Sequence, residues 1–254
     1  MTVLVGVLCS DGVVIGADGI ATSAMGSAPL MHMEANPKIR IFGNAIIATT
    51  GPVGYAQRLD HHLDLAEKGH VFKNLSAREA TSNVSKRFIT ELQESKAPSP
   101  LPEGVGFGGL LGAIDPKEGP YLAEFSTVNF QAEMKLGKTF FGSMGSGQVY
   151  ADPFLVFVAR VLWDNEMPTV ELGKSGVYWV LEHTIKVAPG KVGKPIQLAA
   201  LQKINDAWIA REQDVQESAQ YVEELEDYIG AFEQPPIEEA IAEPVPKPEP
   251  GDGS

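Results

Sequence analysis

The chain opens with two short apolar segments separated by a turn, and this feature constrains its fold more than any other. Thr2–Leu8 and Val13–Ala17 are rich in β-branched residues, and a Ser-Asp-Gly turn sequence lies between them. Segments of this length and composition predict two strands joined as a hairpin. Because apolar residues do not alternate with polar ones in either strand, we expect both faces of the hairpin to be covered. The fold must therefore place a layer on each side of this hairpin.

The following residues group into strands and pairs of helices. A loop is expected over Gly19–Pro37, and Ser76 with Glu79 forms a capping-box pattern at a helix start. The expected strands are 38–42, 45–49, 105–114, 120–126, 128–134, 139–141 and 195–201. The expected helices are 53–69, 76–95, 148–164 and 170–187. Runs of strands followed by runs of helices predict an α+β protein in layers, with two sheets and a helical layer on each outer side.

The last fifth of the chain has a different pattern. Apolar residues seven apart, from Trp208 to Ile229, predict one amphipathic helix over Ile204–Phe232. After Pro235 the composition turns to Pro, Glu, Gly and Ala, which predicts an extended or disordered tail. We therefore divide the chain into a body at residues 2–202, a helical extension at 203–234 and a tail at 235–254.

The charge of the chain argues against two classes of partner. The net charge is −13, and residues 203–254 carry 3 basic and 14 acidic side chains, a net of −11. A near-neutral body with an acidic tail suits neither a nucleic acid nor an anionic membrane, since both are bound through Lys and Arg. No apolar run reaches the ~18–20 residues of a membrane span, and no export signal is visible. We expect a cytoplasmic protein.

Thr2 is the first residue with catalytic potential. Removal of Met1 would leave a threonine that combines a hydroxyl nucleophile with its own α-amine. The unperturbed pKa of such an amine is about 7.7–8.0, so it can act as the base that takes the hydroxyl proton. Many proteins have Thr or Ser after Met1, so this residue alone does not indicate catalysis.

Four more candidates lie at predicted strand ends. Asp18 follows the second strand, Lys38 begins the third, Gly51 precedes a helix, and Ser146 lies between two glycines before another helix. Taken singly, each has a plain structural role. Asp18 and Lys38 can form an ion pair, Gly51 a turn, and Ser146 a helix cap. The five histidines show no metal-ligand spacing, and Cys9 is the only cysteine.

Taken together and in this order, these residues resemble a known family. The matching stretches are Thr2-Val3, Gly16–Thr22, Lys38–Arg40, Thr49–Gln57 and Gly145–Gly147. Over residues 2–202 the chain resembles the proteasome β subunit and its bacterial relative HslV, which are N-terminal nucleophile hydrolases. Among the branches of that family it is most similar to the proteasome homologues of betaproteobacteria.

The resemblance implies a role for each residue. Thr2 would be the nucleophile, Lys38 would lower the pKa of its reactive groups, and Asp18 would orient Lys38. Ser146 would hold the Thr2 amine, and the Gly51 N–H would form the oxyanion hole. The substrate would be bound by Ala21, Thr22, Asn36, Arg40, Thr49 and Val53. The backbone carbonyls of Lys186, Pro189 and Val192 would hold a structural monovalent cation, and no other cofactor is implied.

The implied protein is a threonine-type endopeptidase of four-layer αββα architecture. It would cut peptides or unfolded proteins through an ester on Thr2, inside a proteasome-like double ring of identical subunits. Whether an unfoldase ATPase assists it is left open. Two alternatives are an N-terminal nucleophile amidase for small amides and a non-catalytic ring subunit. The loop at 187–195 lacks the Asp and Ser that proteasome β subunits have there, which leaves the support of Thr2 from this side open.

Overall fold

Two five-stranded antiparallel sheets and five helices form the described part of the chain. The computed structural model describes residues 2–23, 31–33, 37–69, 75–94, 106–189 and 192–233. The first sheet has the strand order β10-β1-β2-β11-β12. Its strands are β1 (Leu4–Cys9), β2 (Gly12–Ala17), β10 (Phe141–Met144), β11 (Gln197–Ile204) and β12 (Ala207–Gln213). The predicted opening hairpin is confirmed, because β1 and β2 pair antiparallel from Leu4 with Ala17 to Cys9 with Gly12.

The second sheet has the order β5-β6-β7-β8-β9. Its strands are β5 (Ile39–Phe42), β6 (Ala45–Thr50), β7 (Gly108–Asp115), β8 (Gly119–Phe125) and β9 (Ala132–Lys135). A small separate hairpin, β3 (Ala21–Ser23) with β4 (Met31–Met33), lies within the segment predicted as a loop. The two five-stranded sheets face each other, and β1 and β2 contact β6, β7 and β8 across the space between them.

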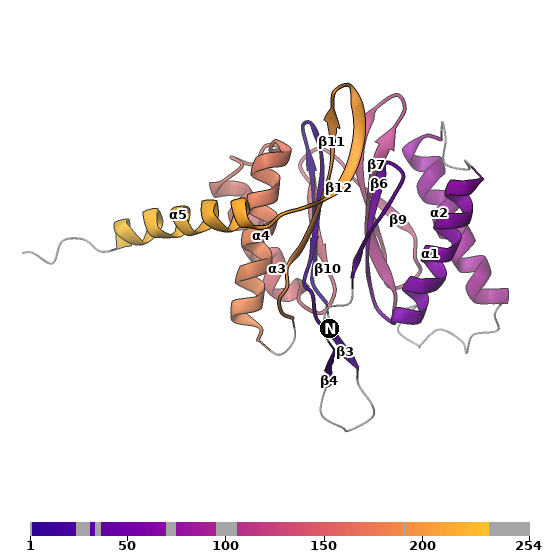
Figure 1. Cartoon of the computed structure of the whole chain (residues 1–254), viewed down its shortest axis with the longest axis horizontal. Coiled ribbons are helices and arrows are strands. Elements are labelled where there is room, and N and C mark those ends of the chain that lie inside the picture. Colours follow the sequence, from indigo (N-terminus) through magenta and orange to yellow (C-terminus); the bar gives the residue numbers. More distant parts are fainter. Residues whose placement is uncertain are drawn as a thin grey trace, which may run out of the picture.

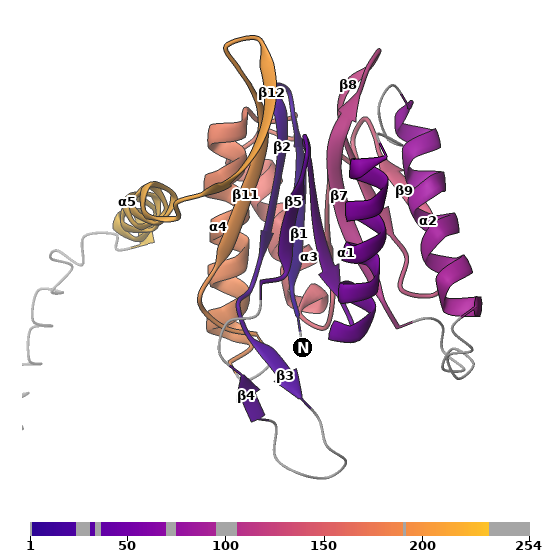
Figure 2. The same cartoon turned by 45° about the vertical axis from the view of Figure 1, so that its right-hand side comes forward.

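The helices cover the outer faces of both sheets. They are α1 (Val53–Lys68), α2 (Ala77–Glu94), α3 (Gln148–Val161), α4 (Val170–Val187) and α5 (Gln216–Glu233). Figure 1 and Figure 2 show α3 and α4 beside the first sheet, and α1 and α2 on the opposite side beside the second. The predicted capping box of α2 is confirmed, since the Ser76 N–H donates to Glu79 Oε2 over 2.9 Å and the Glu79 N–H to Ser76 Oγ over 3.4 Å.

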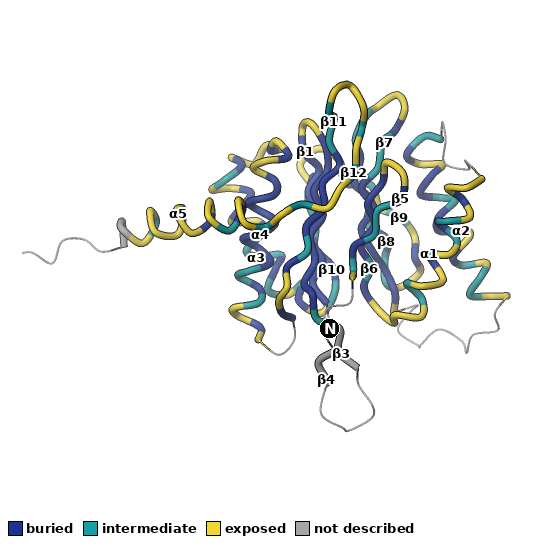
Figure 3. The backbone as a smooth tube through the Cα atoms, in the orientation of Figure 1, coloured by how far each residue is buried: buried dark blue, intermediate teal, exposed yellow. Residues whose placement is uncertain are grey.

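The layers enclose two apolar cores. The first lies around β1 and β2, which are buried at every position because α4 covers one face and the second sheet the other (Figure 3). The second core lies between the second sheet and the helices α1 and α2, with the rings of Phe88, Phe107, Phe125 and Phe130 packed against one another at its centre. The absence of polar alternation in the opening hairpin thus reflects its central position.

The prediction of one helix over Ile204–Phe232 is wrong in its first third. Residues 207–213 form β12, which pairs with β11, and the helix begins only at Gln216. Asn205 and Asp206 have φ values of 48° and 64°, the two consecutive left-handed residues that join strands in a tight hairpin. Trp208 matched the helical spacing by coincidence. The proposed boundary after residue 202 therefore lies inside β11.

Smaller differences occur at turns. The strand expected at 128–134 begins only at Ala132, because buried Phe130 takes a left-handed conformation with φ 54° and closes a turn onto Ser126. The strand expected at 139–141 is observed at Phe141–Met144. The helix expected to reach Asp164 ends at Val161, and Asp164 itself has a φ of 50°. Among the described residues, no helix is both long and apolar enough to span a membrane. The tail predicted at 235–254 lies outside the described residues.

Helix α5 leaves the body from the end of β12. Figure 1 shows that it starts against α4 and then extends away from the sheets. Val222 is buried in this contact, and the Trp179 Nε1–H of α4 donates to Glu226 Oε1 over 2.8 Å. Most of its other residues are exposed (Figure 3), and six of its eighteen residues are acidic while none is Lys or Arg. The helix is therefore docked along one narrow stripe.

Candidate active site

Thr2 lies just before β1, against the loop that joins β10 to α3. The Thr2 nitrogen donates to Ser146 Oγ over 3.1 Å, and the Gly147 N–H donates to the Thr2 carbonyl oxygen over 3.0 Å. In the full chain this nitrogen belongs to a peptide bond, and it marks the position of the free α-amine that removal of Met1 would create. Thr2 is 9% exposed, whereas Ser146 is exposed. The two predicted residues are thus in direct contact.

Gly145 allows this loop to approach Thr2. Its φ is +95°, a conformation that residues with a side chain rarely adopt. A Cβ at this position would lie 2.3 Å from the Thr2 carbonyl oxygen and 3.2 Å from Thr50 Oγ1. Glycine is therefore required here for two reasons: its backbone conformation, and the lack of room for a Cβ. The same contacts bring the end of β6 close to Thr2.

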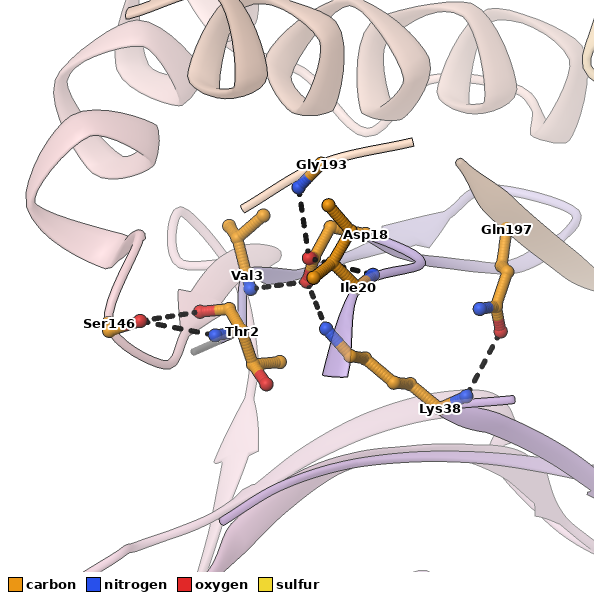
Figure 4. A network of polar contacts seen from close by, with 8 residues as sticks. All are labelled: Thr2, Val3, Asp18, Ile20, Lys38, Ser146, Gly193 and Gln197. Carbon is orange, nitrogen blue, oxygen red and sulfur yellow. Dashed lines mark hydrogen bonds and ion pairs between the residues drawn. The ribbon is translucent and has the colours of Figure 1, made fainter. Parts of the chain in front are cut away.

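Asp18 organises the other side of Thr2. It follows β2 and is fully buried, and its carboxylate accepts four hydrogen bonds from four segments (Figure 4). The Val3 N–H donates to Oδ1 over 2.9 Å, and the Lys38 ammonium donates to the same oxygen over 2.5 Å. The donors to Oδ2 are the backbone N–H groups of Ile20 over 3.3 Å and Gly193 over 3.2 Å. A carboxylate with this many donors is held in one orientation.

Lys38 enters the site from the second sheet. It precedes β5, and its side chain is 8% exposed. Burial lowers the pKa of Lys38 below its ordinary value of 10.5, and the adjacent Asp18 carboxylate opposes that shift. The Lys38 backbone N–H donates to Gln197 Oε1 of β11 over 3.0 Å. Because Asp18 is bonded to both Lys38 and the Val3 N–H, the ammonium lies within a few ångströms of the residue next to Thr2.

Gly51 forms the turn between β6 and α1. Its φ is +120°, and a Cβ there would lie 2.5 Å from the Gly106 carbonyl oxygen, so only glycine fits. The neighbouring Thr50 reaches the Thr2 loop through the contact at Gly145. The structure therefore brings all five predicted catalytic positions to one end of the two sheets: Thr2, Asp18, Lys38, Gly51 and Ser146.

Solved structures of Anbu proteins are among those that resemble this one. Anbu, an ancestral β-subunit, from Yersinia bercovieri has a TM-score of 0.68 and 14% sequence identity over 94% of this chain and 99% of that chain. The helical assembly of the Anbu complex from Pseudomonas aeruginosa has a TM-score of 0.66 and 16% identity over 92% and 98%. An Anbu mutant from Hyphomicrobium sp. strain MC1 has a TM-score of 0.69 and 15% identity over 94% and 99%. No protein-family profile and no curated protein matches the sequence.

The chain has an Anbu-like fold. This finding corrects the placement made from the sequence, which favoured the proteasome β-subunit and HslV family and its betaproteobacterial branch. That placement is wrong, because the structural neighbours are Anbu proteins. The short motifs around Thr2, Lys38 and Ser146 were too few to distinguish one branch from another among proteins of similar fold.

In this Anbu-like fold, three of the six predicted substrate-binding residues lie in β5, β6 and α1: Arg40, Thr49 and Val53. The Thr49 N–H donates to the Lys38 carbonyl oxygen over 3.1 Å, and Arg40 lies two residues after Lys38, within β5. The Arg40 guanidinium forms ion pairs with Asp60, over 3.1 Å, and with Asp64, both on α1. Val53 is 45% exposed at the start of that helix.

The remaining predicted substrate-binding residues are only partly described. Ala21 and Thr22 belong to β3, where they pair with Met33 and His32, and the structure describes their backbone alone. Asn36 lies outside the described residues. The structure therefore gives no side-chain contact for these three residues.

The predicted cation loop follows α4. Pro189 and Val192 form an isolated bridge, and Lys186 lies in the last turn of α4, where backbone carbonyls lack helical partners. Gly190 and Lys191 lie outside the described residues. Among the side chains that are described, no three of His, Cys, Asp and Glu come together as metal ligands would. His62 instead pairs with Glu91 over 3.3 Å.

Residues that the sequence did not single out complete the site. The Gly193 N–H bonds to Asp18 from the loop that lacks the expected Asp and Ser, and Gln197 holds the backbone of Lys38. Asp152 of α3 binds Ser143 and Gln148 on either side of Ser146. Sequence patterns carry no signal for a backbone donor such as Gly193. A polar residue on the first turns of a helix, such as Asp152, is also too common to stand out.

Proposed function

We propose that this chain is a threonine peptidase that uses Thr2 as an N-terminal nucleophile. The single observation that carries the proposal is the hydrogen bond from the Thr2 nitrogen to Ser146 Oγ, next to the buried Lys38–Asp18 pair. A nitrogen held in this way is positioned to act as the base for the threonine hydroxyl once it becomes an amine. In the proposal, removal of Met1 creates that amine.

In this mechanism the Thr2 hydroxyl gives its proton to the Thr2 amine and attacks the carbonyl carbon of a peptide bond. The C–N bond then breaks, the leaving amine takes the proton, and an ester remains on Thr2. Water attacks the ester, with the amine again accepting a proton, and releases the acid product. The positive charge of Lys38 stabilises the negative charge that develops on the Thr2 oxygen, while Asp18 keeps Lys38 oriented.

The backbone N–H of Gly51 is the proposed oxyanion donor. Its turn is fixed by its φ of +120° and by the close approach of Gly106. Removal of one such donor in other hydrolases costs on the order of 10²–10³ in rate. Thr22 and Gly51 would bind the substrate as an added strand through their backbone groups.

We further propose that the fold is a four-layer αββα sandwich of the N-terminal nucleophile hydrolase type and that the chain works in a proteasome-like particle of identical subunits. The helical Anbu assembly from Pseudomonas aeruginosa supports self-association. So does the outer face of α3, which exposes four apolar residues. These are Val149 (71% exposed), Val156 (57%), Phe157 (43%) and Val161 (50%). A face of this kind on a surface helix is typical of a protein contact.

An epoxyketone inhibitor tests the mechanism directly. Such a compound reacts with both the hydroxyl and the amine of an N-terminal threonine. We expect intact mass to show loss of Met1 and one inhibitor per chain, and peptide mapping to place the adduct on Thr2. The Thr2→Ala variant is the control and should show neither the adduct nor peptide hydrolysis.

Two outcomes contradict the proposal. Retention of Met1 in the purified protein removes the proposed base. Hydrolysis by Thr2→Ala at the rate of the unmodified chain places the activity elsewhere. If small amides are hydrolysed while peptides and unfolded proteins are not, the amidase alternative replaces the peptidase.

A further inference from the structure

A second polar cluster lies directly beside the Ser146 loop. Ser143, at the end of β10, donates its hydroxyl to Asp152 Oδ1 over 2.5 Å. Gln148, the first residue of α3, donates its side-chain amide to Asp152 Oδ2 over 3.1 Å. Ser143 is 1% exposed, so its hydroxyl depends on a protein partner rather than on water. Both oxygens of one carboxylate are thus bonded, one to each end of the loop.

The two bonded residues enclose the loop that contacts Thr2. Ser143 pairs with Val5 of β1, and between Ser143 and Gln148 lie Met144, Gly145, Ser146 and Gly147. Gly147 occupies the N-cap of α3 and makes no side-chain capping bond. The Asp152 carboxylate therefore joins the end of β10 to the start of α3.

The loop itself has wide conformational freedom. Two of its four residues are glycines, and Gly145 already has a φ of +95°. Ser146 is exposed, yet its Oγ must stay within hydrogen-bond distance of the Thr2 nitrogen. A loop with such a sequence keeps one geometry only if its ends are fixed. A shift of about 1 Å at a reacting group can lower a rate on the order of 10²-fold.

We propose that Asp152 is a positioning residue that fixes Ser146 against the Thr2 nitrogen by joining Ser143 to Gln148. This inference rests on the proposed function of Thr2. Asp152 acts through geometry rather than through its charge, because both of its oxygens serve as acceptors for neutral groups on the two sides of the loop.

The test compares Asp152→Ala with Asp152→Asn. Alanine removes both bonds. Asparagine keeps both, since its oxygen accepts from Ser143 and its amide donates to the oxygen of Gln148 after that side chain turns over. We expect Asp152→Ala to lower kcat for a peptide substrate on the order of 10- to 100-fold, with KM changed by less than about threefold. Asp152→Asn should retain most of kcat, and Glu166→Gln, an exposed acidic residue beyond the end of α3, should match the unmodified chain.

Two further measurements separate positioning from a general structural role. The acidic limb of the kcat/KM profile should move to lower pH in Asp152→Ala, because loss of the Ser146 acceptor destabilises the ammonium form of Thr2 and lowers its pKa. The profile of Asp152→Asn should stay close to that of the unmodified chain. If Asp152→Ala does not fold, Gln148→Met removes one bond alone and should give a smaller loss in the same direction.

Hydrogen exchange of the loop provides a readout without activity. The Gly147 and Gln148 amides bond to Thr2 and Gly145, and both should exchange faster in Asp152→Ala but not in Asp152→Asn. If Thr2 is unreactive but these amides exchange faster in Asp152→Ala, the proposed function is refuted, while the role of Asp152 in fixing the loop is supported. An active chain in which the alanine variant keeps its kcat, or in which asparagine loses as much as alanine, would refute the positioning role.

Discussion

The Lys38 ammonium donates to Asp18 Oδ1 over 2.5 Å, and the Asp18 side chain is fully buried. The pair links the two sheets, since Asp18 follows β2 and Lys38 precedes β5. Removal of one partner from a buried ion pair leaves the other charge without compensation. We therefore expect Asp18→Ala to cost about 3–5 kcal/mol of unfolding free energy.

Urea unfolding of the unmodified chain and of Asp18→Ala measures this loss of unfolding free energy. Asp115→Ala is a useful comparison, because Asp115 also binds three backbone N–H groups but closes a turn without an ion pair among the contacts described. We expect Asp115→Ala to cost less than Asp18→Ala. A cost below about 1 kcal/mol for Asp18→Ala would show that the pair does not hold the sheets together.

The decline of activity at alkaline pH should follow the deprotonation of Lys38. Burial lowers the pKa of Lys38 below 10.5, and the proposed mechanism needs its charged form. Activity should therefore be present below this lowered pKa and decline as the pH rises through it, earlier than an ordinary lysine would allow. Lys38→Arg should lose kcat, yet any remaining activity should persist to higher pH because arginine stays charged. An identical alkaline limb in both proteins would assign it to another group.

Gly145→Ala should damage both the fold and the site. The backbone conformation alone costs about 1–3 kcal/mol for a residue with a side chain, and the overlap with the Thr2 carbonyl adds to it. Gly54→Ala is the matched control, because a Cβ on this α1 residue meets nothing within 4 Å. It should be neutral or stabilise the protein by up to about 1 kcal/mol. Thermal unfolding and peptide hydrolysis compare the two, and equal stability would contradict the geometry of the loop.

The docking of α5 can be tested at Val222. Its side chain is 1% exposed between α5 and α4, and loss of two methyl groups should cost about 1–2 kcal/mol. Limited proteolysis should cut the α5 segment faster in Val222→Ala than in Glu223→Ala, which changes an exposed neighbour. Equal cleavage rates would mean that the contact with α4 does not hold the helix.

Arg40 offers a test of substrate preference. Its guanidinium is paired with Asp60 and Asp64, so Arg40→Met would leave two carboxylates without their cation. If this residue borders the pocket before the cut bond, cleavage after Lys or Arg should rise relative to cleavage after Glu. A peptide library measures that ratio, and an unchanged ratio would place Arg40 outside the pocket.

Much of the fold follows from local patterns in the sequence. The opening hairpin, the central strands and the helices α1 to α4 were all indicated by apolar spacing and turn residues. The β11–β12 hairpin was missed because Asn205-Asp206 is a turn signal of only two residues, and the apolar spacing across it imitated a helix. Pairing with β11 decides the structure of residues 207–213, and the spacing of apolar residues does not contain that information.

The sequence predicted the candidate catalytic residues but not the residues that hold them in place. Thr2, Asp18, Lys38 and Ser146 were named because, together and in this order, they resemble the motifs of a known family, whereas each of them singly has a plain structural role. Gly193 contributes through a backbone N–H, and Asp152 contributes by joining two residues five positions apart. Such contributions depend on how loops meet in space, and no residue pattern marks them.

The four donors to the Asp18 carboxylate also make the arrangement of the site depend on complete folding of the chain. They come from Val3 before β1, from Ile20 after β2, from the lysine before β5 and from the loop after α4. The carboxylate therefore has all four partners only when both sheets and the loop after α4 are in place. A half-folded or truncated chain would have Thr2 without an oriented Lys38. If the chain is a peptidase, its activity would therefore appear only after folding is complete. Newly synthesised copies nearby would then not be cleaved by partly folded ones.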